Sequence, residues 1–151
     1  WADVWAFETE VRGGDSDCAH GPDRRLARLR ELYAGHFLAH EIEKPWAVEK
    51  RHMLHDKFVR AIREIARTHE IRGQWQEAVH AYQLGIEVDS LAEDLHRGLI
   101  LCHRELGDHV AALSAYRRCR ELLTRMLGIQ PSSKTLALYQ SIRHAAASQH
   151  V

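Results

Sequence analysis

The sequence predicts an all-α fold in which antiparallel helix pairs stack on one another. Apolar positions recur at helical spacing, as in the series Leu54, Phe58, Ile62, Ile65 and His69. No stretch shows the sustained alternation of apolar and polar residues that half-buried strands require. Part of the chain also repeats after a fixed interval. The helical period, the missing strand pattern and the internal repeat together indicate this class.

The expected helices number about seven and span residues 2–11, 22–33, 46–72, 75–88, 91–106, 109–127 and 133–146. Pro22 and Pro45 fall at the first turn of two of them, where proline is tolerated. A glycine follows three of them, where a left-handed closing residue is needed: Gly73, Gly107 and Gly128. Residues 12–21 and 35–45 form two longer connections. Most other links have two to five residues, so neighbouring helices must run antiparallel.

Capping residues mark several helix starts. We expect Ser90 and Glu93 to form a capping box before the helix over 91–106. Asp108 and Ser132 are expected to cap the two helices that follow them. Two further apolar stripes are predicted on the helix over 91–106 and on the closing helix: Leu91, Leu95, Leu99, Cys102 and Leu106, then Leu136, Tyr139 and Ile142.

An internal repeat specifies the architecture. Three residue types recur after 34 positions: Gly73, Ala78 and Tyr82 are matched by Gly107, Ala112 and Tyr116. This period with these residue types is typical of the tetratricopeptide repeat. The glycine lets the first helix stop, the alanine permits close approach of the pair, and the tyrosine fills the gap against the next repeat. The predicted fold is therefore a tetratricopeptide-like stack.

The whole chain, residues 1–151, is expected to form one helical-repeat domain. The two repeats span residues 59–91 and 93–126, and a closing helix spans residues 133–146. An end repeat has no neighbour to cover its apolar face, so such arrays need caps. The closing helix supplies one cap and the first two helices supply the other.

The charge balance and the cysteine count restrict the classes of function that we expect for this chain. The chain has 21 basic and 21 acidic residues, and this balance argues against a strong, independent DNA-binding module. Its three cysteines include no CxxC pair, which favours a reducing, cytoplasmic location. We predict no membrane helix and no signal peptide. Because the chain begins at Trp1 and not at Met, we expect further sequence upstream.

Several segments resemble a known family, the bacterial transcriptional activator domain of antibiotic-regulatory-protein type regulators. The similar segments are WADVWAFE at 1–8, LYAGHFL at 32–38, Trp46 with Arg51, DSLAE at 89–93, the second repeat with Gly107, Ala112, Leu113 and Tyr116, and LGIQPS at 127–132. The last match is the most specific. The chain departs from the family at Ser90, where proline is common, and at Arg125 and Met126, where acidic residues are common.

This resemblance implies the regulatory or protein-interaction domain of a transcriptional activator. It also implies a winged-helix DNA-binding domain just upstream, so that contact with DNA is made only through a domain outside this chain. The domain would position or dimerise that DNA reader, with protein partners that include a second copy, neighbouring domains and the transcription machinery. Two alternatives are a generic tetratricopeptide scaffold and a ligand-sensing domain. No enzymatic role and no cofactor are predicted.

The candidate binding site is a basic groove. In tetratricopeptide arrays the first helix of each pair lines the concave face, and this register points five arginines toward it: Arg60, Arg63, Arg67, Arg97 and Arg104. Guanidinium groups bind carboxylates through two parallel hydrogen bonds. We therefore expect an acidic segment there. The competing interpretation is a solvated face whose arginines pair with nearby acids such as Glu64, Glu70, Asp94 and Glu105.

Three other residue groups suggest chemistry, but each has a structural interpretation that we favour. His52 with His55, and His36 with His40, have metal-ligand spacing, yet no third ligand is evident and we predict no metal site. His69, His96, Cys102 and Cys119 align with apolar stripes and are expected in the core, while Cys18 is expected to be exposed. A cluster of arginines is expected to be the solvent face of a helix rather than a nucleic-acid site: Arg24, Arg25, Arg28 and Arg30.

Overall fold

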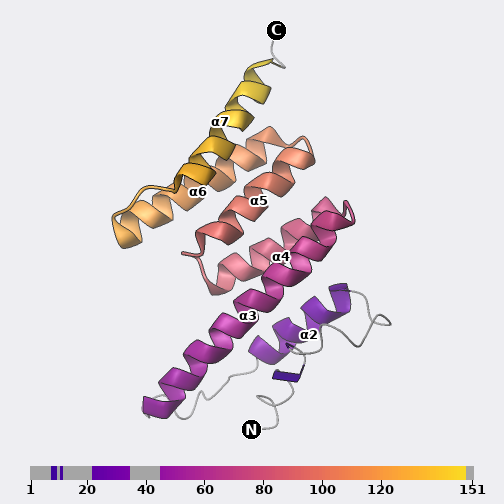
Figure 1. Ribbon diagram of the computed structural model, residues 1–151, viewed down its shortest axis with the longest axis vertical. Coiled ribbons are helices and arrows are strands. Elements are labelled where there is room, and N and C mark those ends of the chain that lie inside the picture. Colours follow the sequence, from indigo (N-terminus) through magenta and orange to yellow (C-terminus); the bar gives the residue numbers. More distant parts are fainter. Residues whose placement is uncertain (1–7, 10, 12–21, 35–44, 149–151) are drawn as a thin grey trace.

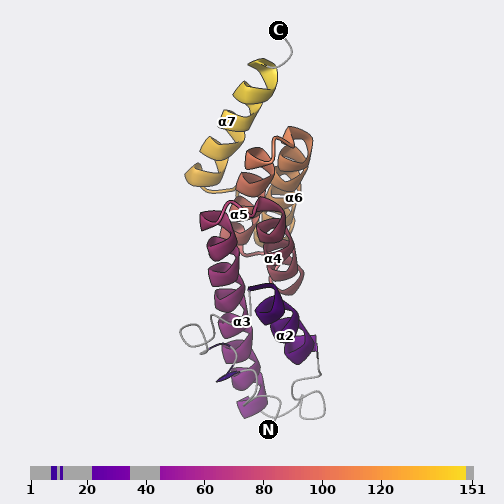
Figure 2. The same cartoon turned by 90° about the vertical axis from the view of Figure 1, so that its right-hand side faces the viewer.

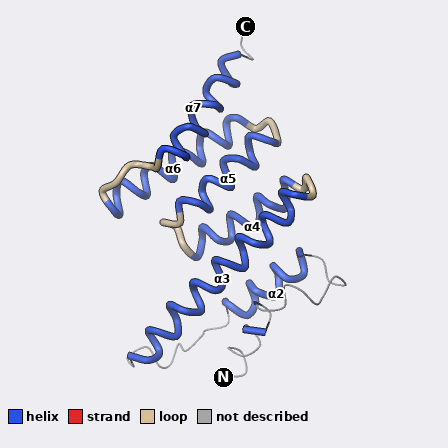
Figure 3. The backbone as a smooth tube through the Cα atoms, in the orientation of Figure 1, coloured by secondary structure: helices blue, strands red, loops and turns tan. Residues whose placement is uncertain are grey.

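The computed structural model describes residues 8, 9, 11, 22–34 and 45–148, and within these residues the chain is helical, with no strand (Figure 3). The helices are α2 (Pro22–Ala34), α3 (Pro45–Ile71), α4 (Trp75–Val88), α5 (Glu93–Glu105), α6 (His109–Leu127) and α7 (Ser133–Ser148). The predicted class is confirmed, and these helices begin and end within two residues of the expected positions. Most of the first expected helix, the connection over 35–44, Cys18, His36 and His40 lie outside the described residues.

The helices stack as antiparallel neighbours along one long axis, with α2 and α3 at one end and α7 at the other (Figure 1). Each helix packs on the next in the chain, and α5 also packs on α7. Seen from the side, α3, α5 and α7 lie along one side of the stack, and α2, α4 and α6 lie along the other (Figure 2). The first helices of successive pairs therefore share one face.

Equivalent residues of the two repeats occupy equivalent places. Gly73 and Gly107 have φ values of 71° and 76°, the left-handed conformation that turns each first helix back into its second. Tyr82 and Tyr116 are each the eighth residue of their helices, α4 and α6, and are 4% and 5% exposed. The internal repeat read from the sequence is thus a repeat of structure.

Each of these tyrosines joins its helix pair to the next element of the stack. The ring of Tyr82 lies so close to Gly98 of α5 that a Cβ added there would be 2.3 Å from Cζ. The ring of Tyr116 stacks on Tyr139 of α7, with 4.0 Å between centroids and 10° between planes. Both contacts agree with the predicted role of the repeat tyrosine.

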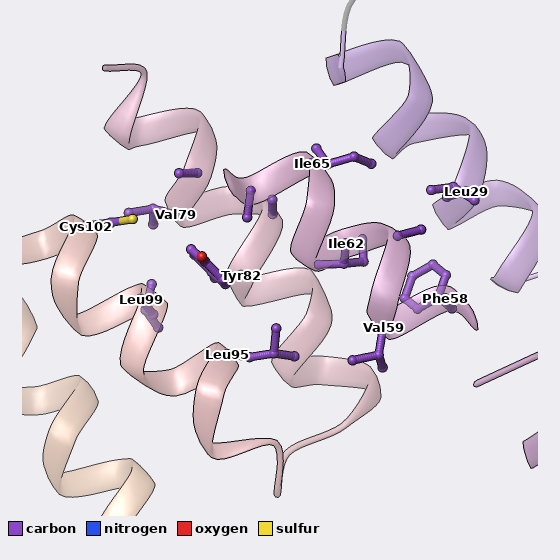
Figure 4. Packing of buried hydrophobic residues seen from close by; sticks show 14 of the residues in the cluster. Leu29, Phe58, Val59, Ile62, Ile65, Val79, Tyr82, Leu95, Leu99 and Cys102 are labelled. Carbon is purple, nitrogen blue, oxygen red and sulfur yellow. The ribbon is translucent and has the colours of Figure 1, made fainter. Parts of the chain in front are cut away.

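The main core lies between α2, α3, α4 and α5 (Figure 4). The predicted stripe of α3 is buried throughout, from Leu54 to His69. Figure 4 shows Val79 and Tyr82 of α4 facing Leu99 and Cys102 of α5. A second cluster joins α5, α6 and α7 through four residues, Ile100, Ala112, Tyr116 and Ile142. These two clusters fix the relative positions of the helices that carry the candidate site.

Three apolar predictions were wrong at their margins. Leu106 is 43% exposed because α5 ends at Glu105, and Leu91 precedes the helix. Leu136 is 42% exposed because the inward face of α7 passes through Thr135 and Ile142, and Leu136 is one position past Thr135. Helical spacing located the stripes correctly but not their ends.

The predicted capping box of Ser90 and Glu93 was also wrong. Ala92 is the N-cap of α5 and provides no side-chain cap. The carboxylate of Glu93 instead accepts hydrogen bonds from the backbone N–H of Ser132, at 2.7 Å, and from the Thr135 hydroxyl, at 2.6 Å. Glu93 therefore ties α5 to the start of α7, a long-range contact that outcompetes the local one.

Other local predictions are confirmed. Asp108 caps α6 by accepting a hydrogen bond from the backbone N–H of Ala111 at 3.0 Å. Gly128 closes the same helix with a φ of 66°. His69 and His96 are each 1% exposed, and the Nε2–H of His96 donates to the carbonyl oxygen of Ser90 at 2.8 Å. Both histidines belong to the core.

Candidate partner-binding groove

The face shared by α3, α5 and α7 carries a groove of about 340 Å³. Two helical stripes form most of it, one from α3 and one from α5, and α7 contributes a single residue. The lining residues are Arg63, Arg67, Glu70, Tyr82, Asp94, Arg97, Gly98, Leu101 and Leu138. The groove thus follows the row of first helices, as the repeat register predicts.

Three of the five predicted arginines line this groove, namely Arg63, Arg67 and Arg97. Arg60 is exposed on α3 but lies outside the lining. Arg104 also lies outside it, and its guanidinium pairs with Glu105 at 2.8 Å. The structure therefore brings the three central arginines of the predicted set together in one groove. It places Arg60 and Arg104 outside that groove.

The three groove arginines differ in their ion pairs. Arg63 pairs with Asp94 at 2.5 Å, a contact that joins α3 to α5 and neutralises this guanidinium. Among the described residues, Arg67 and Arg97 form no ion pair within 4.0 Å. These two side chains come from adjacent first helices, so the groove has two cations available for a ligand.

Arg97 also influences its neighbour Glu93. Burial would raise the pKa of the Glu93 carboxyl, but hydrogen bonds from Thr135 and Ser132 outweigh burial. The nearby positive charge of Arg97 acts in the same direction, so the pKa of Glu93 lies below its ordinary value. Glu93 is therefore ionised near neutral pH, but its carboxylate is already occupied by α7.

A hydrogen-bonded group underlies the groove. The Tyr82 hydroxyl donates to Oε1 of Glu70 at 2.6 Å, and the Cys102 thiol lies 3.8 Å from the same oxygen. Burial, followed by the hydrogen bond to Glu70, raises the pKa of Tyr82. Burial and the charge of Glu70 raise the pKa of Cys102 to about 12. Both groups stay protonated at neutral pH, so this arrangement holds α3, α4 and α5 together and offers no thiolate nucleophile.

Sequence reasoning missed the other groove residues. Glu70 shares the stripe of Arg63 and Arg67, at spacings of seven and three, so helical periodicity could have identified it. Leu101 follows Arg97 by one helical turn in the same way. Leu138 carries no such signal, since its place in the groove depends on how α7 docks on α5. These additions give the groove an apolar side next to its cations.

The remaining candidates are placed as follows. Within the described residues, no group of three or more metal-ligating side chains forms a metal site. Cys102 and Cys119 are fully buried, as predicted. In the arginine cluster over residues 24–30 of α2, Arg25 donates to the carbonyl oxygen of Val11 at 3.1 Å, and Arg28 pairs with Glu31 at 3.6 Å. Part of that cluster therefore stabilises the N-terminal end of the stack.

The described residues thus form an all-α stack of tetratricopeptide-like helix pairs with a partly basic groove on the face of the first helices. A family model described as the bacterial transcriptional activator domain matches residues 2–143. The chain belongs to this family. The resemblance stated from its sequence segments is thereby confirmed.

No curated protein sequence matches the chain. Among solved structures, the chain is similar to the crystal structure of MamA, with a TM-score of 0.41 and 15% sequence identity. That similarity covers 97% of this chain and 88% of the other. Of the helices in the described part of the chain, none is both long enough and apolar enough to span a membrane.

Proposed function

We propose that this chain is the cytoplasmic interaction domain of a bacterial transcriptional activator, and that its groove binds an acidic segment of a protein partner. By holding that segment, the domain positions or pairs a winged-helix DNA-binding domain located elsewhere in the whole protein. The partner surface belongs to a neighbouring domain, to a second copy or to the transcription machinery. Family membership supports the transcriptional role, and the groove supports the mode of contact.

One observation carries the binding mode. Arg67 and Arg97 project from adjacent helices into one groove and form no ion pair with a described residue. Guanidinium groups left in this state gain charge-assisted hydrogen bonds when a carboxylate arrives. Leu101 and Leu138 lie beside them and can cover an apolar side chain of the same ligand. The groove therefore suits a segment in which acidic and apolar residues alternate.

Arg63 has a different role from the two unpaired arginines. Its ion pair with Asp94 joins α3 to α5, so its replacement would disturb the stack as well as the groove. A test of binding should leave it in place. Arg67 and Arg97 can be reversed in charge without breaking any ion pair among the described residues.

The experiment uses the complete gene in the bacterium that carries it. Transcripts that change when the gene is deleted define the genes that the activator controls. We expect Arg67→Glu with Arg97→Glu to reproduce the deletion profile at an unchanged level of the protein. The matched control is Arg24→Glu with Arg30→Glu, which makes the same charge change at two exposed positions of α2 and should preserve the normal profile.

Two results would count against the proposal, and they are distinguishable. If deletion alters no defined set of transcripts, the domain acts as a scaffold outside transcription. If deletion alters such a set but the Arg67, Arg97 variant behaves like the unaltered protein, the domain regulates transcription without using this groove. Circular dichroism of the isolated variant chain would show that its helices remain folded.

A further inference from the structure

The zero net charge of the chain conceals a strong asymmetry between its two ends. Residues 109–151, which contain α6 and α7, carry six basic side chains and one acidic one, a net charge of +5. Residues 1–108 carry the other 15 basic and 20 acidic side chains, a net charge of −5. Because α6 and α7 lie at one end of the stack, their excess of basic side chains is concentrated there (Figure 1). The α7 end of the stack is basic.

The basic side chains of α6 gather at one depression. It has a volume of about 380 Å³ and lies between α6 and the segment that leads to α7. Its lining residues are Arg117, Arg120, Glu121, Thr124, Arg125 and Gln130. It is separate from the candidate partner-binding groove, because the two share no lining residue.

The arginines of this depression are largely free of intramolecular pairs. Arg125 pairs with Glu121 at 3.0 Å, and both side chains are more than two-thirds exposed, so solvent weakens that pair. Arg117 and Arg120 are exposed and form no ion pair with a described residue. Lys134 and Arg143 on α7 add positive charge at the same end of the stack.

We propose that this α6 surface binds the phosphate backbone of duplex DNA without reading its sequence. Arg117 and Arg125 are eight residues apart, which spaces their Cα atoms about 12 Å along the helix. A row of guanidinium groups of this length can follow several successive phosphates of one strand. Arginine, threonine and glutamine side chains are also common donors to phosphate oxygens.

An extended polyanion matches the surface better than a short acidic peptide does. The basic residues extend beyond the depression onto α7, and the lining of the depression includes one acidic residue, Glu121. A ligand with regularly spaced negative charges can use such a surface along its whole length. DNA contact of this kind would add affinity to an activator whose sequence-reading domain lies elsewhere, which goes beyond the role proposed for the groove.

The test measures binding of the chain to a fluorescent random-sequence duplex at increasing salt. If three arginines each meet one phosphate, the logarithm of the association constant falls with the logarithm of salt with a slope of about −2.7. Affinity then drops about 40-fold between about 50 and 200 mM salt. Arg117→Ala with Arg120→Ala should reduce the slope to about −0.9 and the drop to about 3.5-fold.

The matched control is Arg24→Ala with Arg30→Ala, which removes two exposed arginines from α2 and should leave the slope unchanged. Helical content by circular dichroism checks folding, and Arg117→Gln with Arg120→Gln provides a second variant that removes the charge but keeps a polar, hydrogen-bonding side chain. The proposal is overturned if the unaltered chain fails to bind the duplex at low salt, or if the α6 variants bind like it. It is also overturned if polyglutamate binds as tightly as DNA with the same loss in the variants, since the ligand would then be an acidic protein.

Discussion

Replacement of Gly98 by alanine tests how one repeat packs on the next. Gly98 lies in α5 against the ring of Tyr82 from α4. A new Cβ would be 2.3 Å from Cζ, 2.5 Å from Cε1 and 2.7 Å from Cε2 of that ring. The ring is 4% exposed and its hydroxyl is bound to Glu70, so it has little freedom to move aside.

The expected effect is a net loss of about 2 kcal/mol of unfolding free energy. Overfilling a packed core costs about 1–3 kcal/mol. Displacement of the ring would also weaken its hydrogen bond to the charged Glu70, a bond of a kind that contributes about 1.5–3 kcal/mol. The higher helix propensity of alanine offsets about 1 kcal/mol of these losses. For a chain of this size, the net loss lowers the unfolding temperature by about 4–8 °C.

The assay is chemical and thermal denaturation of a double-mutant cycle. In a Tyr82→Leu background the ring is absent, so Gly98→Ala should not lower the free energy of unfolding there. It should instead stabilise the chain by up to about 1 kcal/mol. Gly85→Ala is a useful comparison, because its Cβ would meet flexible methyl groups of Leu95 and Ile62 at 2.9 and 3.0 Å. The reasoning is refuted if Gly98→Ala stabilises the unaltered chain, or if its cost persists without the Tyr82 ring.

Two further predictions concern buried polar groups. Glu93→Ala should lower the free energy of unfolding by about 2 kcal/mol, because the buried Thr135 hydroxyl loses its acceptor, and it should also speed amide exchange in α7. The control, Glu121→Ala on the exposed side of α6, should have little effect on either measurement. Since the pKa of Glu93 is lowered, its contribution is present above the ordinary value of 4.5 and is lost as pH falls through the lower folded value, and Glu93→Gln should reduce this acid dependence. Burial lowers the pKa of His96, so the unfolded chain takes up a proton first and stability should fall as pH drops below 6.5. In His96→Gln, the denaturation midpoint should fall less steeply as pH drops, and the remaining fall is due to His103, whose pKa is also lowered by burial. A pH dependence that is unchanged in His96→Gln would contradict the role given to His96.

The helices could be predicted because their signals are local. The turn glycines Gly73, Gly107 and Gly128 all have left-handed φ values, a conformation for which glycine is the default residue. The stripe in α3 follows directly from helical geometry. Equal offsets between Tyr82 and Tyr116 then required the two helix pairs to share one architecture.

Contacts between distant segments could not be predicted in this way. Glu93 matches a local capping box, yet its carboxylate is bound by Ser132 and Thr135, which lie 39 and 42 residues further along the chain. The repeat register placed Arg63, Arg67 and Arg97 in the groove. It could not show that Asp94 neutralises the first of them, nor that Leu138 completes the lining.

The basic end of the stack illustrates a different difficulty. Its charge is readable in the sequence, but a total of zero over the whole chain removes the signal. The asymmetry becomes meaningful once the structure places α6 and α7 together at one end (Figure 1). Charge summed by structural element is therefore more informative here than charge summed over the chain.

Peptide binding with paired charge reversals tests the groove most directly. Two fluorescent peptides are compared, one with glutamates flanking a leucine and one with lysines in their place. The unaltered chain should bind the glutamate peptide at least about tenfold more tightly, a difference of about 1.4 kcal/mol. Arg67→Glu with Arg97→Glu should invert that preference. An unaltered chain without a preference, or a preference that survives in the variant, would contradict the assignment of the groove as an acidic-segment site.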